Sequence, residues 1–444
     1  MRKLRFSQTQ IIALGFFLII ALGTLLLMLP ISTRNGEGAT FREALFTATS
    51  SSCVTGLVLQ DTYSYWTGFG QVVLLLLIQL GGLGFMTIAT LFAMLMRRKI
   101  GIRERELLSE SINSTHIGGI VRLTKKIMIG TAIFEGAGAV ALSFRFIPDF
   151  GFWKGLWTAV FTSVSAFCNA GFDLMGRLTP YASLSPYADD ILVNVTVMLL
   201  IVIGGIGFLV WDDLSRKGLR ISRYQLHTKI VLTVTFALIF FGAAAFFLLE
   251  RRWAADMSWT ERILTSFFDA ITPRTAGFNT TDTGALTDAS KLLTCILMFI
   301  GGSPGSTAGG IKTTTLAVLL VYGFSYIRQK PAFGMFGRRL EVGSLQKAAT
   351  VFFTNLLLML LSAIVIAGMH HEIPLADILF ECSSAIGTAG MTTGITRELL
   401  PAAQYLLVLL MYCGRVGSLS FATALSTRRR RPKVMDPVEK ITIG

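Results

Sequence analysis

Long apolar runs alternate along this chain with short stretches of small and polar residues. The runs over residues 11–31 and 71–96 contain no charged side chain. Uninterrupted apolar runs of about 18 residues or more are typical of membrane-spanning helices. The first run has no A-x-A cleavage site and is longer than the apolar part of a signal peptide, so we interpret it as a spanning helix. The pattern therefore predicts an all-α membrane protein.

The apolar and polar segments repeat in the same order four times. Each unit has a spanning run, a short piece that cannot span, a glycine-containing stretch and a second spanning run. The first helices are expected at 8–30, 126–147, 230–249 and 350–367. The short pieces are expected at 41–49, 153–165, 259–271 and 375–384, and the second helices at 71–96, 191–210, 291–327 and 404–424. This order predicts eight spanning helices in four parallel repeats, 1–105, 106–223, 224–340 and 341–444.

The glycine-containing stretches align on one residue in each repeat. These glycines are Gly56, Gly171, Gly277 and Gly390, and neighbouring ones lie between 106 and 115 residues apart. A large apolar residue follows each of them. A phenylalanine stands ten positions before each one, at Phe46, Phe161, Phe267 and Phe380. A feature that recurs four times at nearly constant spacing indicates one structural unit used repeatedly.

The repeated stretches carry little side-chain chemistry, which points to the backbone as the functional group. Unpaired backbone at membrane depth is tolerated only where it lines a cavity or is buried in protein. Carbonyl oxygens can replace the hydration shell of a cation, and glycine lets the chain turn them toward an axis. We therefore expect four loops around a pseudo-fourfold pore. Its cation would be bound by the carbonyl groups of Val54, Thr55, Gly56, Asn169, Ala170, Gly171, Thr275, Ala276, Gly277, Thr388, Ala389 and Gly390.

Composition and charge place the chain in a membrane and give it an orientation. Charged residues make up 15% of the sequence, below the roughly 25% of a soluble domain. The net charge of +14 comes from basic clusters at 97–105, 216–223, 328–339 and 428–433. Each cluster follows an apolar run, where the positive-inside rule applies. We interpret them as cytoplasmic parts of a multi-pass plasma-membrane protein with both termini inside, and not as a nucleic-acid-binding surface.

The second helix of the third repeat is interrupted by small and polar residues from Gly301 to Thr315. Pro304 removes a helix hydrogen bond, and the glycines in this stretch destabilise a helix. A simple kink would need only the proline, whereas the length of the interruption favours an irregular loop. The glycine clusters at 81–84 and 204–207 lie at a similar depth and are interpreted as sites of close helix packing.

Two ionisable residues lie at membrane depth. Arg415 is in the last predicted helix and Glu135 is about midway along the first helix of the second repeat. Such groups are functional by default, although a structural ion pair would also explain Arg415 and packing support would also explain Glu135. Asp61 and Asp173 follow their glycine loops and either concentrate cations at an outer mouth or act as ordinary loop acids. No nucleotide motif, catalytic triad or metal-ligand cluster appears, so no enzyme is predicted.

The four glycine loops resemble those of the membrane subunits of the Trk/Ktr/HKT potassium-transport superfamily, over almost the whole chain. Eight helices favour the Ktr branch, because Trk subunits carry two more. The resemblance implies that the four aligned glycines are filter glycines, and glycine instead of serine at Gly56 goes with K⁺. It also implies a homodimer in membrane lipid and a KtrA-like cytoplasmic ring of nucleotide-binding regulatory subunits.

The resemblance further implies a gate below the filter. The gate is expected to comprise Gly302, Ser303, Pro304, Gly305, Ser306, Gly309, Gly310 and Lys312, with Arg415. The expected function is K⁺ uptake through a channel-like pore, with K⁺ in the pore and no covalent cofactor. The membrane potential would drive it with about 2.3 kcal/mol per charge per 100 mV. The alternatives are a symporter that couples K⁺ to Na⁺ or H⁺, and a membrane subunit without a pore.

Overall fold

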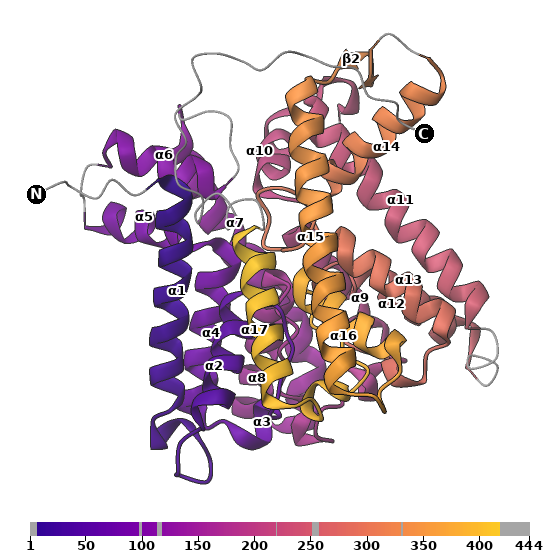
Figure 1. The fold of residues 1–444 in the computed structure, drawn as a ribbon. Coiled ribbons are helices and arrows are strands. Elements are labelled where there is room, and N and C mark those ends of the chain that lie inside the picture. The colour runs from indigo at the N-terminus through magenta and orange to yellow at the C-terminus, as the bar shows by residue number, and fades with distance from the viewer. Residues whose placement is uncertain are drawn as a thin grey trace, which may run out of the picture.

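The computed structural model describes residues 7–96, 100–112, 118–218, 220–250, 257–329 and 332–417. Figure 1 shows long helices with shorter helices between them, with α5 and α6 at one end of the molecule and α3 at the other. Residues 97–99, the end of the predicted helix 404–424 and the basic cluster at 428–433 lie outside the described residues.

In the first two repeats the predicted first helix, short piece and second helix follow in order, with the second helix divided in two. The first contains α1 (Gln8–Leu27), α2 (Phe41–Ser52), α3 (Thr62–Tyr65), α4 (Gly68–Leu83), α5 (Phe85–Leu95) and α6 (Ile102–Ser111). The second contains α7 (Ile120–Phe150), α8 (Phe152–Cys168), α9 (Ile191–Gly205) and α10 (Phe208–Lys217). The short helices α3 and α6 were not predicted from the sequence.

The third and fourth repeats follow the same order. The third contains α11 (Leu226–Leu249), α12 (Trp259–Ile271), α13 (Asp288–Ile300) and α14 (Thr313–Ile327), followed by the antiparallel strands β1 (Gly334–Met335) and β2 (Arg338–Arg339). The fourth contains α15 (Val342–Met369), α16 (Leu375–Gly387) and α17 (Pro401–Val416). Single 3₁₀ turns are η1 (Pro30–Ser32), η2 (Met175–Arg177), η3 (Ser185–Tyr187), η4 (Ile221–Arg223), η6 (Thr283–Ala285) and η7 (Ile395–Arg397).

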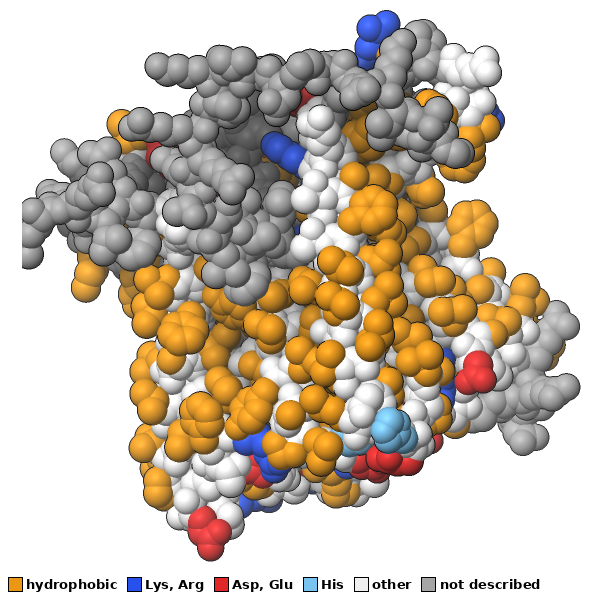
Figure 2. Space-filling view, viewed as in Figure 1, with side chains coloured by type: hydrophobic (Ala, Val, Ile, Leu, Met, Phe, Trp, Pro, Cys, Tyr) orange, Lys and Arg blue, Asp and Glu red, His pale blue; other side chains and the backbone are white. Residues whose placement is uncertain are grey.

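Several helices are long and apolar enough to cross a membrane. Among the described residues these are α1, α7, α11 and residues 343–369 of α15, or six spans if α4 with α5 and α9 with α10 are each one bent span. Large apolar side chains of α1 stay exposed, such as Phe17 and Leu22 at 59% and 60%. Figure 2 shows apolar side chains over the middle of one face, with charged side chains toward both ends and histidine toward the end that holds α3. This distribution fits an apolar surface surrounded by lipid.

The second helices of repeats one and two are broken, which the sequence interpretation missed. The helix predicted over 71–96 is two helices, α4 and α5, that meet at 98°, and the one over 191–210 is α9 and α10 at 95°. The break falls at Gly84 and Gly207, whose φ angles are +79° and +97°. The predicted close packing is present as well, because a side chain on Gly81 or Gly204 would overlap the carbonyl oxygen of Ser52 or Phe167. The glycine clusters therefore both pack and end helices.

The short helices α2, α8, α12 and α16 point their C-terminal ends at the four aligned glycine loops. Thr40 starts α2 with a capping box, in which Glu43 accepts a hydrogen bond from the Thr40 N–H and returns one to its hydroxyl. Three of the aligned phenylalanines, Phe46, Phe161 and Phe380, are at most 1% exposed. Buried aromatic side chains of this size fix a short helix by packing, since the helix is too short to be stable alone.

The loop over residues 174–190, called here the cross-repeat loop, joins α8 to α9 and contacts the other three repeats. Its Tyr181 N–H donates to the carboxylate of Asp61 (3.1 Å), and its Leu184 N–H donates to the carbonyl of Asn279 (2.9 Å). The guanidinium of Arg397 lies 3.8 Å from the centroid of the Tyr181 ring. Repeats one, three and four are therefore all held to one segment of repeat two.

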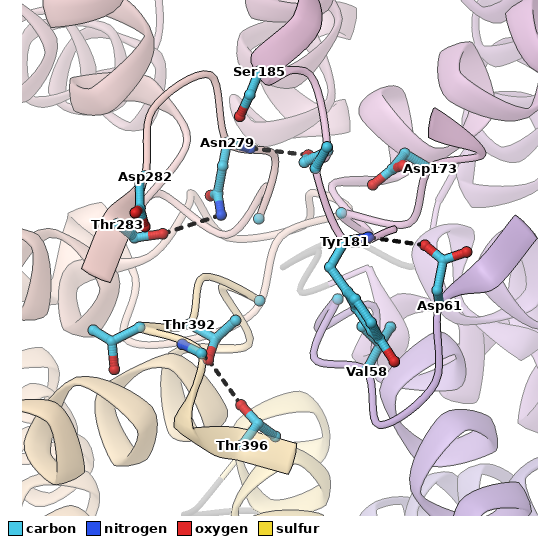
Figure 3. A pocket seen from close by; sticks show the side chains of 18 of the residues that line it. Val58, Asp61, Asp173, Tyr181, Ser185, Asn279, Asp282, Thr283, Thr392 and Thr396 are labelled. Atoms are coloured by element: carbon cyan, nitrogen blue, oxygen red, sulfur yellow. Dashed lines mark hydrogen bonds between the residues drawn. The ribbon is translucent and has the colours of Figure 1, made fainter. Parts of the chain in front are cut away.

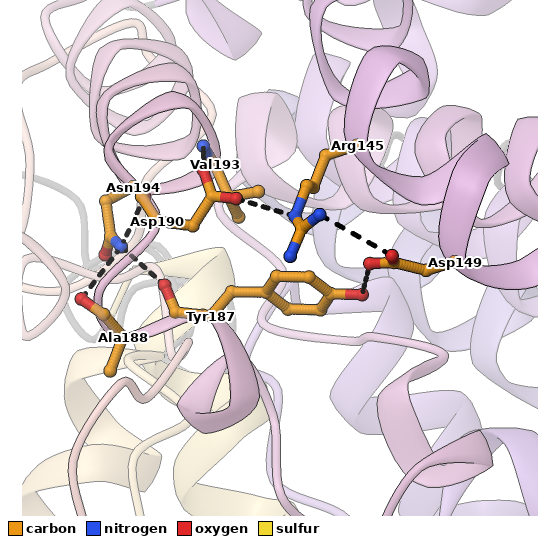
Figure 4. A network of polar contacts seen from close by, with 7 residues as sticks. All are labelled: Arg145, Asp149, Tyr187, Ala188, Asp190, Val193 and Asn194. Atoms are coloured by element: carbon orange, nitrogen blue, oxygen red, sulfur yellow. Dashed lines mark hydrogen bonds and ion pairs between the residues drawn. The ribbon is translucent and has the colours of Figure 1, made fainter.

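A polar network ties the end of the cross-repeat loop to α7 (Figure 4). Arg145 donates to Asp190 (2.8 Å), and the Tyr187 hydroxyl donates to Asp149 (2.8 Å). The side chain of Asn194 donates to the carbonyls of Tyr187 and Asp190 at 2.7 and 2.8 Å. Burial raises the pKa of Tyr187, with the Asp149 hydrogen bond adding to the effect. The phenol therefore stays a neutral donor to Asp149.

Candidate functional site

The four aligned glycines meet at the centre of the molecule, and each one faces the next repeat. A methyl group built on Gly56 would lie 2.7 Å from the carbonyl oxygen of Ala170, and one on Gly171 would lie 2.7 Å from that of Ala276. One on Gly277 would lie 2.6 Å from the carbonyl oxygen of Ala389. The ring closes where Gly390 meets the carbonyl of Thr55. The loops predicted from the sequence are therefore brought together in cyclic order.

Each loop has the same unusual backbone. The aligned glycines have φ angles of +101°, +69°, +81° and +83°. The residue two positions earlier also has a positive φ, although it carries a side chain: Val54 (+56°), Asn169 (+59°), Thr275 (+79°) and Thr388 (+51°). In an extended chain successive carbonyls point to opposite sides. A positive φ at every second residue rotates every second peptide plane. Successive carbonyl groups can then face the same side of the chain.

The residue before each glycine is buried and anchored through its N–H. Thr55, Ala170 and Ala389 donate to the carbonyls of Ser50, Ser165 and Ser384 at 2.7, 2.8 and 2.8 Å, and Ala276 donates to that of Thr272 at 2.9 Å. The three serines belong to the last turns of α2, α8 and α16, and Thr272 directly follows α12. The hydrogen bonds use the N–H groups and leave the carbonyls of these residues directed at the neighbouring loop.

A cavity of about 350 Å³ opens on one side of the glycine ring and is called here the vestibule. It is lined by all four glycines, by Tyr181 of the cross-repeat loop and by polar residues of every repeat (Figure 3). Asp61 and Asp173, which the sequence placed at an outer mouth, line it, and so do Asp282 and Arg397, which the sequence interpretation missed. Burial raises the pKa of Asp173 to about 7.

A second cavity, of about 530 Å³, lies on the other side of the ring and shares no lining residue with the vestibule. It is lined by Gly305, Ser306, Gly310, Lys312 and Arg415 among the predicted gate residues. We call residues 301–312 the inner loop. The inner loop follows the end of α13 at Ile300, and α14 begins at Thr313, so the predicted interruption is a true loop and not a kink.

The inner loop lies directly against the fourth glycine loop and contacts the broken helix of repeat two. A side chain on Gly309 would overlap the Thr388 hydroxyl, and one on Gly310 would lie 3.0 Å from the carbonyl of Gly387. The N–H of Ser303 donates to Gly205 (3.0 Å), and the N–H of Phe208 donates to Gly305 (2.7 Å). The loop therefore packs between the fourth glycine loop and the broken helix of repeat two, and it lines the second cavity.

Two basic residues hold the inner loop. The guanidinium of Arg415 donates to the carbonyl of Thr307 and to the carbonyls of Gly81 and Gly82, the last at 3.1 Å. The ammonium of Lys312 donates to Ala308 and Gly309 at 2.8 and 3.0 Å. Arg415 thus joins α17, α4 and the inner loop, whereas Lys312 ties the loop to itself. The ion pair that the sequence left open for Arg415 is absent among the described residues, where backbone carbonyls accept from its guanidinium.

Glu135 has partners but lines neither cavity. The amide nitrogen of Gln79 donates to its carboxylate (3.1 Å), and the thiol of Cys168 lies 3.8 Å from the same group. These contacts join α7, α4 and α8. Glu135 is thus placed where it supports packing between repeats one and two, which is one of the two interpretations that the sequence left open.

The chain matches known cation transporters over its whole length. The TrkH family model, described as a cation transport protein, matches residues 5–435. The potassium/sodium uptake protein NtpJ of Enterococcus hirae is 39% identical, over 99% of this chain and 98% of that protein.

Further relatives extend the match to the Ktr branch and to a solved fold. The Ktr system potassium uptake protein B of Bacillus subtilis is 40% identical, over 94% of this chain and 92% of that protein. The crystal structure of the potassium transporter TrkH from Vibrio parahaemolyticus has the same fold, with a TM-score of 0.72, 17% identity and coverage of 96% of this chain and 86% of that one. The chain therefore belongs to the TrkH/Ktr family of cation transport proteins.

Proposed function

We propose that this chain takes up K⁺ through a pore whose selectivity filter is the ring around Gly56, Gly171, Gly277 and Gly390. The observation that carries the proposal is the cyclic contact of each glycine with the carbonyl of the residue before the next glycine. A ring of carbonyls can replace the hydration shell of a bare K⁺ ion. The vestibule would supply the ion from outside, and the second cavity would receive it.

The short helices support the same assignment. α2, α8, α12 and α16 end at the ring, so the partial negative charge of four helix C-termini is directed at the place where the cation would lie. Asp61 and Asp282 in the vestibule add negative charge at its mouth, which raises the local concentration of cations. No step of this passage needs chemistry at a side chain, as expected for a pore driven by voltage.

The test is K⁺ uptake by the purified chain in liposomes. We expect uptake to follow the membrane voltage and to persist when the Na⁺ and H⁺ gradients are removed in turn at fixed voltage. Uptake that stops when only one of those gradients is removed would instead identify a symporter. No K⁺ uptake by correctly folded protein, with a regulatory partner present, would mean that the ring does not conduct.

We also propose that the inner loop is the gate and that a KtrA-like cytoplasmic ring moves it. The loop packs against the fourth filter loop, lines the second cavity and is tied to α17 and α4 through Arg415, which supports this proposal. A partner can shift such a loop only by binding one of its arrangements more tightly. The names of the Bacillus subtilis and Vibrio alginolyticus relatives describe them as parts of a Ktr system, which supports a partner component. A homodimer in the plasma membrane completes the proposed assembly.

The orientation in the membrane can be tested with two cysteine variants. We expect Asn35→Cys, in the exposed loop after α1, to react with an impermeant thiol reagent added outside cells. Ser215→Cys, exposed in α10, should react only after the membrane is made permeable, because the basic residues Arg216 and Lys217 follow it. The parent protein is the control, since four of its five cysteines are buried. The opposite labelling pattern would reverse the topology.

A further inference from the structure

Glu381 is a carboxylate in the middle of α16, and its residue is only 1% exposed. A buried carboxylate is costly unless donors satisfy its oxygens. Glu381 finds its donors in the chain that follows the fourth filter glycine. The hydroxyl of Thr392 and the N–H of Thr393 (3.2 Å) donate to one oxygen, and the hydroxyl of Thr396 (2.7 Å) donates to the other.

The segment from Thr392 to Thr396, called here the post-filter turn, is built around this carboxylate. The hydroxyls of Thr392 and Thr396 lie 2.9 Å apart, and the N–H of Gly394 donates to Thr392 (2.9 Å). The side chain of Gln404 donates to the carbonyl of Thr396 (3.2 Å) and so links the turn to α17. Figure 3 shows Thr392 and Thr396 together at the wall of the vestibule.

The post-filter turn is separated from Gly390 by a single residue, Met391, which is 2% exposed. A displacement of the turn must therefore be taken up by Gly390 or by the turn itself. Gly390 has little freedom, because a methyl group built on it would lie 2.8 Å from the Cα of Gly56 and would overlap the carbonyl oxygen of Thr55. The fourth filter loop is thus fixed on one side by repeat one and on the other by Glu381.

Repeats one and two lack this arrangement. The residues nine positions before their filter glycines, where Glu381 stands in repeat four, are Thr47 and Thr162. Their buried hydroxyls have no hydrogen-bond partner among the described residues. In repeat three the equivalent position is Phe268, and Asp269, one residue later on α12, accepts a long hydrogen bond from the Thr281 hydroxyl (3.3 Å). Glu381 is therefore a feature of repeat four and not a general packing residue of the four short helices.

We infer that Glu381 is a positioning residue for ion selectivity, which holds the post-filter turn and through it the carbonyls at Gly390 in the spacing that suits K⁺. The inference rests on the proposed filter. It concerns a residue that does not line the vestibule and that acts through Thr392 and Thr396.

The experiment compares Glu381→Met with Glu381→Gln in liposomes. Methionine has a similar length but offers only a weak acceptor, so the hydrogen bonds to the turn are lost. Glutamine can keep them, because its amide oxygen accepts from Thr392 and Thr393 while its amide nitrogen donates to Thr396. We expect Glu381→Met to lower the ratio of K⁺ to Na⁺ uptake about tenfold and Glu381→Gln to stay within about twofold of the parent; the tenfold change corresponds to about 1.4 kcal/mol.

Removing a hydroxyl group that donates to Glu381 should also lower the ratio of K⁺ to Na⁺ uptake. Thr396→Val keeps the shape of the side chain and removes its hydroxyl, so we expect it to lower the K⁺/Na⁺ ratio as well. Combined with Glu381→Met, it should add little, because both variants break one interaction. The matched control is Asp377→Asn, one turn earlier on α16, where the carboxylate pairs with Lys291 (2.9 Å) and not with the turn.

Each outcome separates the positioning role from a structural one. Lower thermal stability of Glu381→Met with an unchanged K⁺/Na⁺ ratio in the folded protein would overturn the inference. So would an equal loss of selectivity in Asp377→Asn. If Gly56→Ser changes the ratio while Glu381→Met does not, the filter stands and Glu381 does not position it. If neither changes the ratio, the filter assignment itself is wrong.

Discussion

Replacing Gly390 with serine is expected to lower K⁺ uptake at least about tenfold and to reduce the preference for K⁺ over Na⁺. Gly390 has a φ of +83°, and holding a residue with a side chain in such a conformation costs about 1–2 kcal/mol. The new Cβ would also lie 2.8 Å from the Cα of Gly56 and would overlap the carbonyl oxygen of Thr55. Because these are backbone atoms, the two filter loops must separate, which widens the ring.

Gly56→Ser should act in the same direction with a smaller effect. Its Cβ would lie 2.7 Å from the carbonyl oxygen of Ala170. The matched control is Gly36→Ser, since Gly36 also has a positive φ (+73°) but has open space where a Cβ would lie. The measurement is the ratio of K⁺ to Na⁺ uptake in liposomes. If both filter variants fold and keep the parent's ratio, the ring of glycines does not select the ion.

Deleting Ser306–Gly310 is expected to raise K⁺ uptake in the absence of a partner about tenfold while leaving the K⁺/Na⁺ ratio largely unchanged. The inner loop packs against the fourth filter loop and lines the second cavity, so we expect its removal to open a path between the filter and that cavity. A tenfold rise corresponds to losing roughly 1.4 kcal/mol of preference for the closed arrangement. Because the loop does not contribute carbonyls to the ring, selectivity should survive.

The deletion can close without stretching the chain. The N–H of Thr313 donates to the carbonyl of Gly302 (3.0 Å), and the N–H of Ile311 donates to that of Phe299 (3.3 Å), so the two ends of the loop already lie side by side. We therefore expect α13 and α14 to stay in place when residues 306–310 are deleted.

Arg415→Ala should shift uptake in the same direction by a smaller amount, because it releases Thr307 but leaves the loop present. Arg415→Lys is the control for Arg415→Ala. Lysine keeps the positive charge but lacks the planar guanidinium that donates to three carbonyl groups. If the deletion variant folds and dimerises normally and yet takes up K⁺ only when the regulatory partner is present, the inner loop has a packing role and is not the gate.

The alignment of the four glycines was enough to predict which loops meet. Their spacing and the phenylalanine ten positions earlier identify equivalent residues, and equivalent residues of four parallel repeats must surround one axis. The backbone of the loops was less predictable. Val54 and Thr275 adopt positive φ angles that such side chains rarely take, and only the surrounding structure can impose them.

The breaks in α4–α5 and α9–α10 could not be separated from packing in the sequence. Gly81 and Gly84 are three residues apart, yet one packs against a carbonyl and the other ends a helix. Glycine permits both, so the residue type does not decide between them. The partners of Glu381 were missed because they lie 11 to 15 residues away in a turn. A carboxylate in a short helix of small and apolar residues was the signal that could have found them.

The cross-repeat loop bears on why the four repeats occur in one polypeptide. Tyr181 and Ser183 sit over the filter glycines, and the same segment reaches repeats one, three and four. Only one such segment fits there, so four identical subunits carrying it would collide at their shared axis. The inner loop of repeat three has the same property on the opposite side of the ring. When the four repeats are parts of a single polypeptide, the sequence of each repeat can differ from the others. The cross-repeat loop of repeat two can then cover the vestibule side of the ring, and the inner loop of repeat three can obstruct the other side.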